Sequence, residues 1–144
     1  MSAAAGSYMT DSELLQLAEH AREKAYAPYS RFKVGAALLT KDQQIFCGCN
    51  VENAAYGLCN CAERTAFFSA IAAGYKPGDF LKLAVIADTV DPISPCGACR
   101  QVIQELGGES LAIILGNLHG ESMNTTSSAL LPGAFSRTTL NQAT

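Results

Sequence analysis

The chain has 144 residues, a length typical of one domain, with many hydrophobic residues (49%) and few charged ones (16%). Its net charge of −3 counts against binding to nucleic-acid backbones, which depends on Lys and Arg. No apolar run approaches the ~20 residues of a membrane span, and residues 1–9 lack the basic and apolar regions of a signal peptide. We expect a cytoplasmic protein whose six cysteines are thiols or metal ligands. A surface so poor in charge also suggests that another subunit covers part of it.

The first predicted elements are a helix and a hairpin, which follow an N-terminal extension (residues 1–9) that we expect to be disordered. Residues 10–144 are predicted to form a single domain. Thr10-Asp11-Ser12-Glu13 is typical of a capping box, and apolar residues follow at helical spacing as far as Ala25, before Pro28 ends the helix. Residues 33–39 and 43–49 resemble two strands around a turn, and residues 50–60 form an irregular loop.

The second half of the chain alternates helices with buried strands. A helix is predicted from Cys61 to Gly74, and its nearly all-apolar body predicts burial on every side. The elements expected after it are a strand at 82–87, a loop at 88–95, a helix at 97–106, a strand at 111–115, a turn at 117–120, a short strand and a helical turn at 126–131. This order predicts a layered α/β domain.

Three cysteines have the spacing of a metal site. Pro95-Cys96-Gly97-Ala98-Cys99 places a C-x-x-C at the start of a helix, where a redox pair is the alternative. The long loop before it favours a metal. Cys61 opens another helix and is followed by Glu63. Together these residues match the C-x-E…P-C-x-x-C pattern of zinc deaminases that bind the metal with three cysteines.

The number of ligands separates two hypotheses about this site. Three protein ligands and one open position are typical of catalytic zinc, whereas four ligands close a structural site. Cys59 could supply a fourth thiolate, and Glu63 would then be an acid that stabilises a helix N-terminus. The spacing of Glu63 and Pro95 favours the catalytic alternative. The remaining thiols and both histidines are expected to be ordinary core or surface groups: Cys47, Cys49, His20 and His119.

Arg64 is predicted to tune the charge of the metal site. Three thiolates and Zn²⁺ sum to −1, and an over-negative ion is a poorer Lewis acid. An arginine in the same helical turn can donate hydrogen bonds to the thiolates and withdraw this charge. The alternative is an ordinary surface arginine.

Several segments resemble the short, homotetrameric, zinc-dependent cytidine deaminases, in order and across roughly residues 12–140. The segments that carry the resemblance are Ala27-Pro28-Tyr29-Ser30, Asn50-Val51-Glu52-Asn53-Ala54-Ala55-Tyr56, Cys61-Ala62-Glu63-Arg64-Thr65-Ala66, Ser94-Pro95-Cys96-Gly97-Ala98-Cys99-Arg100-Gln101 and Leu130-Leu131-Pro132-Gly133-Ala134-Phe135. The fold that the resemblance implies is three-layer α/β/α, with a five-stranded mixed sheet covered by helices.

The resemblance also implies roles for single residues. Cys61, Cys96 and Cys99 would bind one zinc ion per subunit, and Glu63 would shuttle protons. The substrate contacts implied are Asn50 and Glu52 to the ribose hydroxyls, the Ala62 backbone to the pyrimidine, Phe32 to the base, and Tyr56 and Phe135 from neighbouring subunits. The partners implied are a free pyrimidine nucleoside and three further copies of the chain, without nucleic acid or membrane.

The activity implied is hydrolytic deamination of cytidine and 2′-deoxycytidine in pyrimidine salvage, with ammonia released. A polynucleotide-editing deaminase is one alternative, but the pI near 5.3 and the lack of a basic stripe count against it. A non-catalytic zinc or redox module is another. A deaminase of a cytosine-bearing antibiotic nucleoside shares the zinc motif, but Asn50-x-Glu52 suits a ribose, since Asn and Glu together offer donors and acceptors for vicinal hydroxyls.

Overall fold

A computed structural model describes residues 9–142 of the chain. Residues 1–8 of the extension predicted to be disordered lie outside the described range, and Met9 packs against the core beside the first helix. The described residues contain a five-stranded mixed sheet of order β2-β1-β3-β4-β5, in which only β3 and β4 are parallel neighbours. The strands are β1 (Val34–Thr40), β2 (Ile45–Cys49), β3 (Phe80–Ala87), β4 (Ala112–Asn117) and β5 (Ser122–Thr126). The predicted sheet is therefore confirmed.

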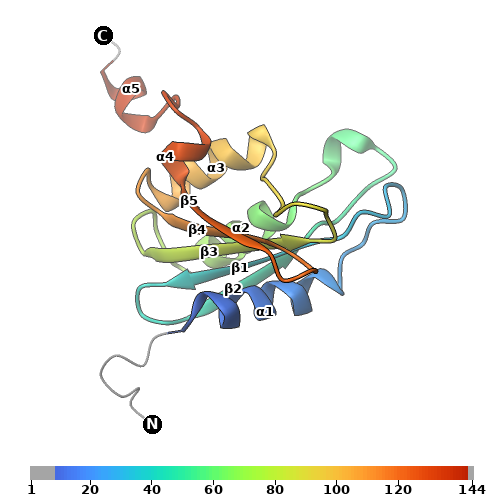
Figure 1. The fold of residues 1–144 in the computed structure, drawn as a ribbon. Coiled ribbons are helices and arrows are strands. Elements are labelled where there is room, and N and C mark those ends of the chain that lie inside the picture. The colour runs from blue at the N-terminus through green and yellow to red at the C-terminus, as the bar shows by residue number, and fades with distance from the viewer. Residues whose placement is uncertain (1–8, 143–144) are drawn as a thin grey trace.

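Helices cover both faces of the sheet, which gives the expected three layers (Figure 1). The helix α1 (Asp11–Arg22) lies on one face, and α2 (Ala62–Ala72) and α3 (Gly97–Gly107) lie on the other. Because side chains alternate along a strand, β1 contributes to two separate cores. Ala37 and Leu39 pack on the α1 side, whereas Ala36 and Leu38 pack on the side of α2 and α3.

The first helix is shorter than the sequence predicts. The capping box is present, with the Thr10 side chain accepting from Glu13 N and the Glu13 side chain accepting from Thr10 N, but the helix ends at Arg22 rather than continuing past Ala25. The chain then pairs with the loop after β2. Tyr26 N donates to Asn50 O at 3.0 Å, and its carbonyl accepts from Glu52 N at 2.8 Å. Helical spacing could not reveal this pairing, because its partner is some 25 residues away.

The prediction that α2 is buried on every side is wrong for the single chain. Its inner face, which includes Ala66, Phe67 and Ala70, is buried against the sheet and α3. On the opposite face, Phe68 is 47% exposed and Ile71 is 37% exposed. A helix on the outside of a sheet has one covered face, so a helix that is apolar all round leaves an apolar face uncovered.

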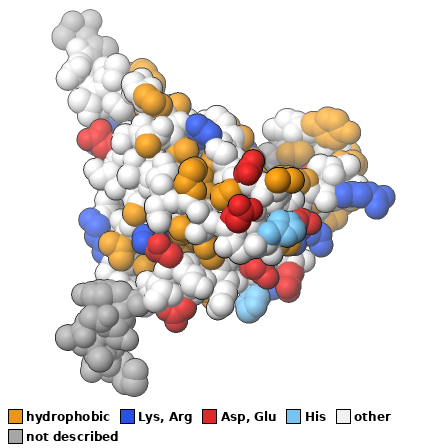
Figure 2. Space-filling model, viewed as in Figure 1, with side chains coloured by type: hydrophobic (Ala, Val, Ile, Leu, Met, Phe, Trp, Pro, Cys, Tyr) orange, Lys and Arg blue, Asp and Glu red, His pale blue; other side chains and the backbone are white. Residues whose placement is uncertain are grey.

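Two further regions extend from the layers (Figure 1). The loop between β2 and α2 contains a short 3-10 helix, η1 (Tyr56–Leu58), and Figure 2 shows hydrophobic side chains gathered on its protruding tip. At the other end, α4 (Ser127–Leu130) follows β5 as predicted, and α5 (Arg137–Asn141), which the sequence analysis did not predict, begins after a Ser136 cap. Among the described residues, no helix has the length and apolar character needed to cross a membrane.

Candidate metal centre and substrate cavity

Three cysteine sulphurs converge on one point, as the spacing predicts. The Sγ atoms of Cys61, Cys96 and Cys99 all lie within 4.8 Å of one another, and Cys61 Sγ is 3.8 Å from Cys96 Sγ. Cys99 is fully buried, Cys61 is half-buried and Cys96 is exposed. The group of sulphurs is therefore covered by protein at Cys99 and open to solvent at Cys96.

Two helix ends bring these sulphurs together. Cys61 is the N-cap residue of α2, and Cys96 is the N-cap residue of α3. The Sγ of Cys96 accepts a hydrogen bond from Cys99 N at 3.5 Å. Free N–H groups and the positive end of the helix dipole stabilise negative charge at such positions. Both capping sulphurs therefore lie where the helix ends would stabilise a metal-bound thiolate.

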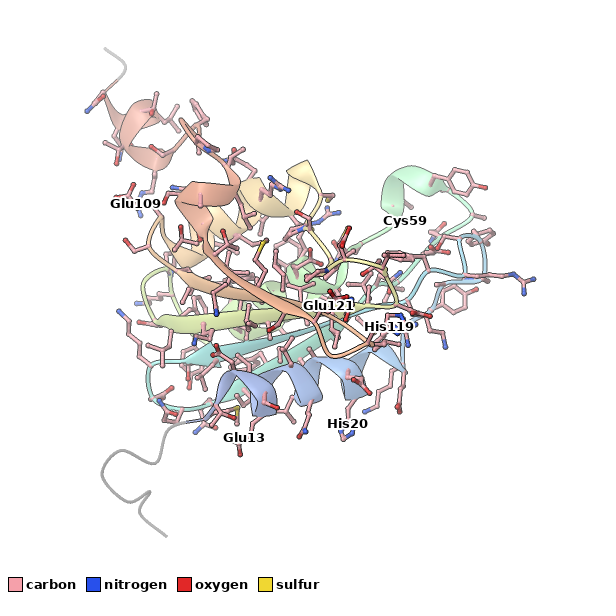
Figure 3. The ribbon with its side chains drawn as sticks, in the orientation of Figure 1. Glu13, His20, Cys59, Glu109, His119 and Glu121 are labelled. Carbon is pink, nitrogen blue, oxygen red and sulfur yellow. The ribbon has the colours of Figure 1, made fainter. Side chains whose placement is uncertain are left out.

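The geometry fits a tetrahedral metal with three sulphur ligands. With Zn–S bonds of about 2.3 Å, tetrahedral angles separate the sulphurs by about 3.8 Å. The 3.8 Å distance between Cys61 Sγ and Cys96 Sγ agrees with this value. Cys59 does not belong to the group: its Sγ accepts from Asn53 N at 3.3 Å, and it lies on the protruding η1 loop (Figure 3). Three ligands with an open position are therefore favoured over a closed four-cysteine site.

Arg64 lies against the sulphurs, where the charge argument places it. Its Nη2 donates to Cys61 Sγ at 3.3 Å, and this contact raises the pKa of the guanidinium further above neutrality. Its Nε is buried and has no hydrogen-bond partner within residues 9–142. A surface arginine would be surrounded by water, so the structure favours an electrostatic role beside the thiolates.

The thiols share their protons unequally. The pKa of Cys61 lies below that of an ordinary thiol, mainly because the Cys99 thiol donates to it and also because Arg64 does. The pKa of Cys99 is raised, because it supplies this hydrogen bond and because it is buried. Cys61 is therefore ready to bind a cation, and the proton on Cys99 leaves when a metal takes its place.

Glu63 is a buried carboxyl group beside this centre. It lies in the first turn of α2, is 4% exposed, and lines the same cavity as Cys61 and Cys96. Burial raises its pKa to about 7, and the neighbouring Cys61 thiolate contributes in the same direction. A carboxyl group with such a pKa can both accept and release a proton near neutral pH.

A cavity of about 220 Å³ opens in front of the sulphurs and Glu63. Four of the residues predicted to contact substrate line it: Phe32, Asn50, Glu52 and Ala62. Phe32 comes from the loop before β1, Asn50 and Glu52 follow β2, and Ala62 begins α2. Residues about 30 positions apart in the chain are thus brought to one hollow next to the metal ligands.

Two predicted contact residues lie outside this cavity. Tyr56 is 73% exposed and lines an adjoining hollow of about 320 Å³, which shares Ser30 and Glu52 with the first. Phe135 is 60% exposed, and its carbonyl accepts from Gln101 Nε2 at 2.9 Å. Neither ring touches the metal centre of its own chain, so their predicted roles depend on neighbouring subunits.

The histidines are remote from the centre. His20 is exposed on the last turn of α1, as predicted (Figure 3). His119 lies in the turn between β4 and β5, where its Nε2 is 3.1 Å from Asp88 Oδ1. It therefore contacts a carboxylate at the surface, a partner that the sequence analysis did not foresee.

Three residues that organise the cavity were not predicted from the sequence. Ser30 and Ser94 line it, and Arg100 holds the loop before Cys96. The guanidinium of Arg100 donates to Pro95 O at 2.8 Å, to Ser94 Oγ at 2.6 Å and to Leu130 O at 2.7 Å. The only signal was their position inside the matched motifs, since nothing in local periodicity connects Arg100 with Leu130.

Comparisons with known proteins agree with this site. A family model described as the cytidine and deoxycytidylate deaminase zinc-binding region matches residues 9–115. Cytidine deaminase from Sporosarcina psychrophila is 53% identical over 135 residues, covering 94% of this chain and 98% of that protein. The Halalkalibacterium halodurans cytidine deaminase is 54% identical over 128 residues, covering 89% of this chain and 96% of that protein. The crystal structure of cytidine deaminase from Burkholderia pseudomallei has a TM-score of 0.88 and 61% identity, and the match covers 88% of this chain and 100% of that one.

Proposed function

This chain belongs to the cytidine and deoxycytidylate deaminase family, and on that premise we propose that it hydrolyses cytidine and 2′-deoxycytidine to uridine and 2′-deoxyuridine, with release of ammonia. The observation that carries the proposal is the group of three sulphurs with one open side, next to a buried glutamate in a shared cavity. This combination supplies a catalytic metal and a proton carrier at one point. Such a reaction has its place in pyrimidine salvage.

Zinc is the cofactor, held by Cys61, Cys96 and Cys99, with one ion expected per subunit. When bound, it acidifies a water molecule and so supplies the nucleophile for C4 of the pyrimidine. The chain contributes a fixed set of three ligands and an opening that faces the cavity. The helix N-termini stabilise the thiolates that the ion requires.

Glu63 is the proton carrier in this proposal. It accepts a proton from the attacking water and delivers it to N3 of the pyrimidine. It then takes the proton of the hydroxyl newly bonded to C4 and passes it to the amino group, which leaves as ammonia. Its raised pKa, about 7, suits both directions of transfer near neutral pH. It lies in the first turn of α2 and lines the same cavity as Cys61 and Cys96, so its carboxyl would lie beside a metal held by these cysteines.

The nucleoside would be bound by groups on three elements. Phe32 packs on the base, the Ala62 backbone contacts the pyrimidine, and Asn50 and Glu52 bind the ribose hydroxyls. Asn50 is held in place because its Oδ1 accepts from Val34 N at 2.8 Å and its Nδ2 donates to Phe32 O at 2.7 Å. One N–H and one lone pair of the amide remain available for a sugar hydroxyl.

Arg64 would tune the metal rather than contact the substrate. Three thiolates with Zn²⁺ carry a net charge of −1, and the guanidinium 3.3 Å from Cys61 Sγ withdraws part of it. A bound ion would thereby remain a stronger Lewis acid. The hydrogen bond and the buried Nε support this role over that of a surface cation.

The functional unit is proposed to be a homotetramer with active sites shared between subunits, located in the cytoplasm. The uncovered apolar face of α2, with Phe68 and Ile71, supports contact with another copy. In such an assembly, Tyr56 and Phe135 of neighbouring chains would complete each cavity. A free nucleoside is the expected partner, without nucleic acid or membrane, because the chain is acidic and poor in Lys and Arg.

The proposal is tested by mixing purified protein with cytidine, 2′-deoxycytidine, a cytosine-bearing antibiotic nucleoside and cytosine-containing single-stranded DNA. We expect ultraviolet absorbance of the two free nucleosides to fall, with one ammonia released for each nucleoside consumed, and the DNA to be unchanged. Conversion of the DNA, or of the antibiotic alone, would replace the proposed substrate class. No conversion of any of the four would exclude the activity.

A further inference from the structure

The loop before β1 folds back onto the carboxylate of Glu52. Glu52 Oε1 accepts from Tyr29 N at 3.0 Å and from Ser30 N at 3.1 Å. Glu52 Oε2 accepts from the Ser30 hydroxyl. Three donors from one short turn therefore hold both oxygens of a residue that lies more than 20 positions later in the chain.

The direction of the Ser30 hydrogen bond is fixed by its neighbour. Phe32 N donates to Ser30 Oγ at 3.0 Å, so the hydroxyl accepts there and gives its single proton to Glu52. Phe32 O in turn accepts from Asn50 Nδ2. The peptide groups of Phe32 are thus connected to both sugar-facing residues, and Ser30 is the connection on the Glu52 side.

This arrangement limits what Glu52 can do in the cavity. A carboxylate has about four lone-pair positions. Two on Oε1 and one on Oε2 are occupied, which leaves one position for a donor from outside the chain. The hydrogen bond from Ser30 also lowers the pKa of Glu52, so the carboxylate is ionised and accepts only.

The backbone of the turn is specialised for this contact. Arg31 has a φ of +56°, which places a non-glycine residue in the left-handed region, and its N–H donates to Ala27 O at 2.9 Å. Such a conformation persists only where the surroundings hold it. It allows Ser30 and Phe32, on either side of Arg31, to approach Glu52 and Asn50 at the same time.

We propose that Ser30 is a positioning residue for nucleoside recognition, which directs the one free lone pair of Glu52 toward a single sugar hydroxyl and ties that contact to the position of Phe32. The inference rests on the proposed function and extends it to a residue that touches Glu52 rather than the reacting atoms. Without the Ser30 hydroxyl, Oε2 gains a second free position and loses the donor that orients it, while the two N–H donors to Oε1 remain. The loss must then appear only with substrates that carry the hydroxyl that Glu52 binds.

The test compares Ser30→Ala with wild type on cytidine, 2′-deoxycytidine and 3′-deoxycytidine. We expect kcat/KM for cytidine to fall about tenfold, the usual cost of a lost hydrogen bond to a charged group. For the analogue that lacks the hydroxyl bound by Glu52, the fall should be less than twofold. Ser30→Thr, which keeps the hydroxyl, should restore most of the activity on cytidine.

Thr10→Ala is a matched control, because Thr10 also hydrogen-bonds a glutamate, Glu13, at the start of α1, far from the cavity. It should leave kcat/KM unchanged for all three nucleosides. An equal penalty for Ser30→Ala on all three would overturn the inference alone, since it would indicate a general structural role. A failure of Ser30→Thr to recover activity on cytidine would also overturn it. Wild-type protein that converts none of the nucleosides would overturn the proposed function and this inference together.

Discussion

Gly48 of strand β2 lies in close contact with the start of α2, the helix that begins after Cys61 and contains Glu63. An ideal Cβ at this position would lie 2.3 Å from Ala62 O and 2.6 Å from Ala66 N. Both obstacles are backbone atoms of α2 and cannot rotate away, so Gly48→Ala must push the start of α2 off strand β2. The same movement displaces Cys61, which caps this helix, and Glu63 in its first turn.

The magnitude follows from two opposing effects. Overpacking a core costs typically about 1–3 kcal/mol, and rigid backbone obstacles place this substitution at about 3 kcal/mol. Alanine is favoured over glycine inside a strand by up to about 1 kcal/mol, which leaves a net loss of about 2 kcal/mol. For a domain of this size, that corresponds to a melting temperature lower by about 4–8 °C.

Thermal unfolding followed by circular dichroism, together with kcat/KM for cytidine, measures both consequences. We expect kcat/KM to fall about a hundredfold, because a displacement of about 1 Å in a catalytic group has that effect. Gly116→Ala is the control: its Cβ would first meet Leu15 Cδ2 at 2.9 Å, the end of a flexible side chain. It should melt close to wild type with full activity. A Gly48→Ala protein that melts within 2 °C of wild type and keeps its activity would refute this reasoning.

Three further predictions concern the site. Burial raises the pKa of Glu63 from 4.5 to about 7, so the folded metal-free protein loses up to about 3 kcal/mol of stability as pH rises from about 4.5 to about 7. Metal-free Glu63→Gln should therefore have a higher urea midpoint of unfolding than metal-free wild type at pH 8, and a similar midpoint at pH 4.5. Equal midpoints at pH 8 would contradict this prediction. Arg64→Gln should shift the acid limb of the pH–rate profile to higher pH and lower kcat more than it raises KM, because a bound ion would become a poorer Lewis acid. A change in KM alone would instead indicate that Arg64 contacts the substrate. Truncation after Leu131 should lower kcat/KM severalfold, because it removes Phe135 from the cavity of a neighbouring subunit. Light scattering on the intact chain should report a tetramer. A fully active monomer would contradict both the shared cavity and the tetramer.

The ligand set and the sheet were predictable because local rules govern them. A residue that caps a helix has its side chain at the helix end, so Cys61 and Cys96 could be placed at two converging N-termini from their sequence context alone. Alternating and continuous apolar runs likewise indicated β1 to β4, whereas β5 is mainly polar and was expected only as a short strand after the turn at 117–120. The contact of Arg64 with Cys61 was likewise predictable, because both residues lie in one helical turn; its effect on the charge of the metal stays a prediction.

Other features depend on contacts that local pattern does not encode. The end of α1 at Arg22 is set by pairing of Tyr26 with the loop after β2, which competes with helical propensity. The side of α2 that bears Phe68 and Ile71 is uncovered because no element among residues 9–142 packs on it, although the composition of α2 is that of a fully buried helix. The contact between Ser30 and Glu52 arises from a turn with a left-handed residue, Arg31, which no periodicity indicates.

The proposed function requires that three cysteines hold one zinc ion and leave its fourth position open beside Glu63. X-ray absorption at the zinc edge, combined with elemental analysis of the active protein, measures the ligand set directly. We expect about one zinc per chain, with three sulphur neighbours at about 2.3 Å and one oxygen neighbour at about 2.0 Å. Four sulphur neighbours, which would add Cys59 to the group, or active protein without zinc, would contradict this expectation.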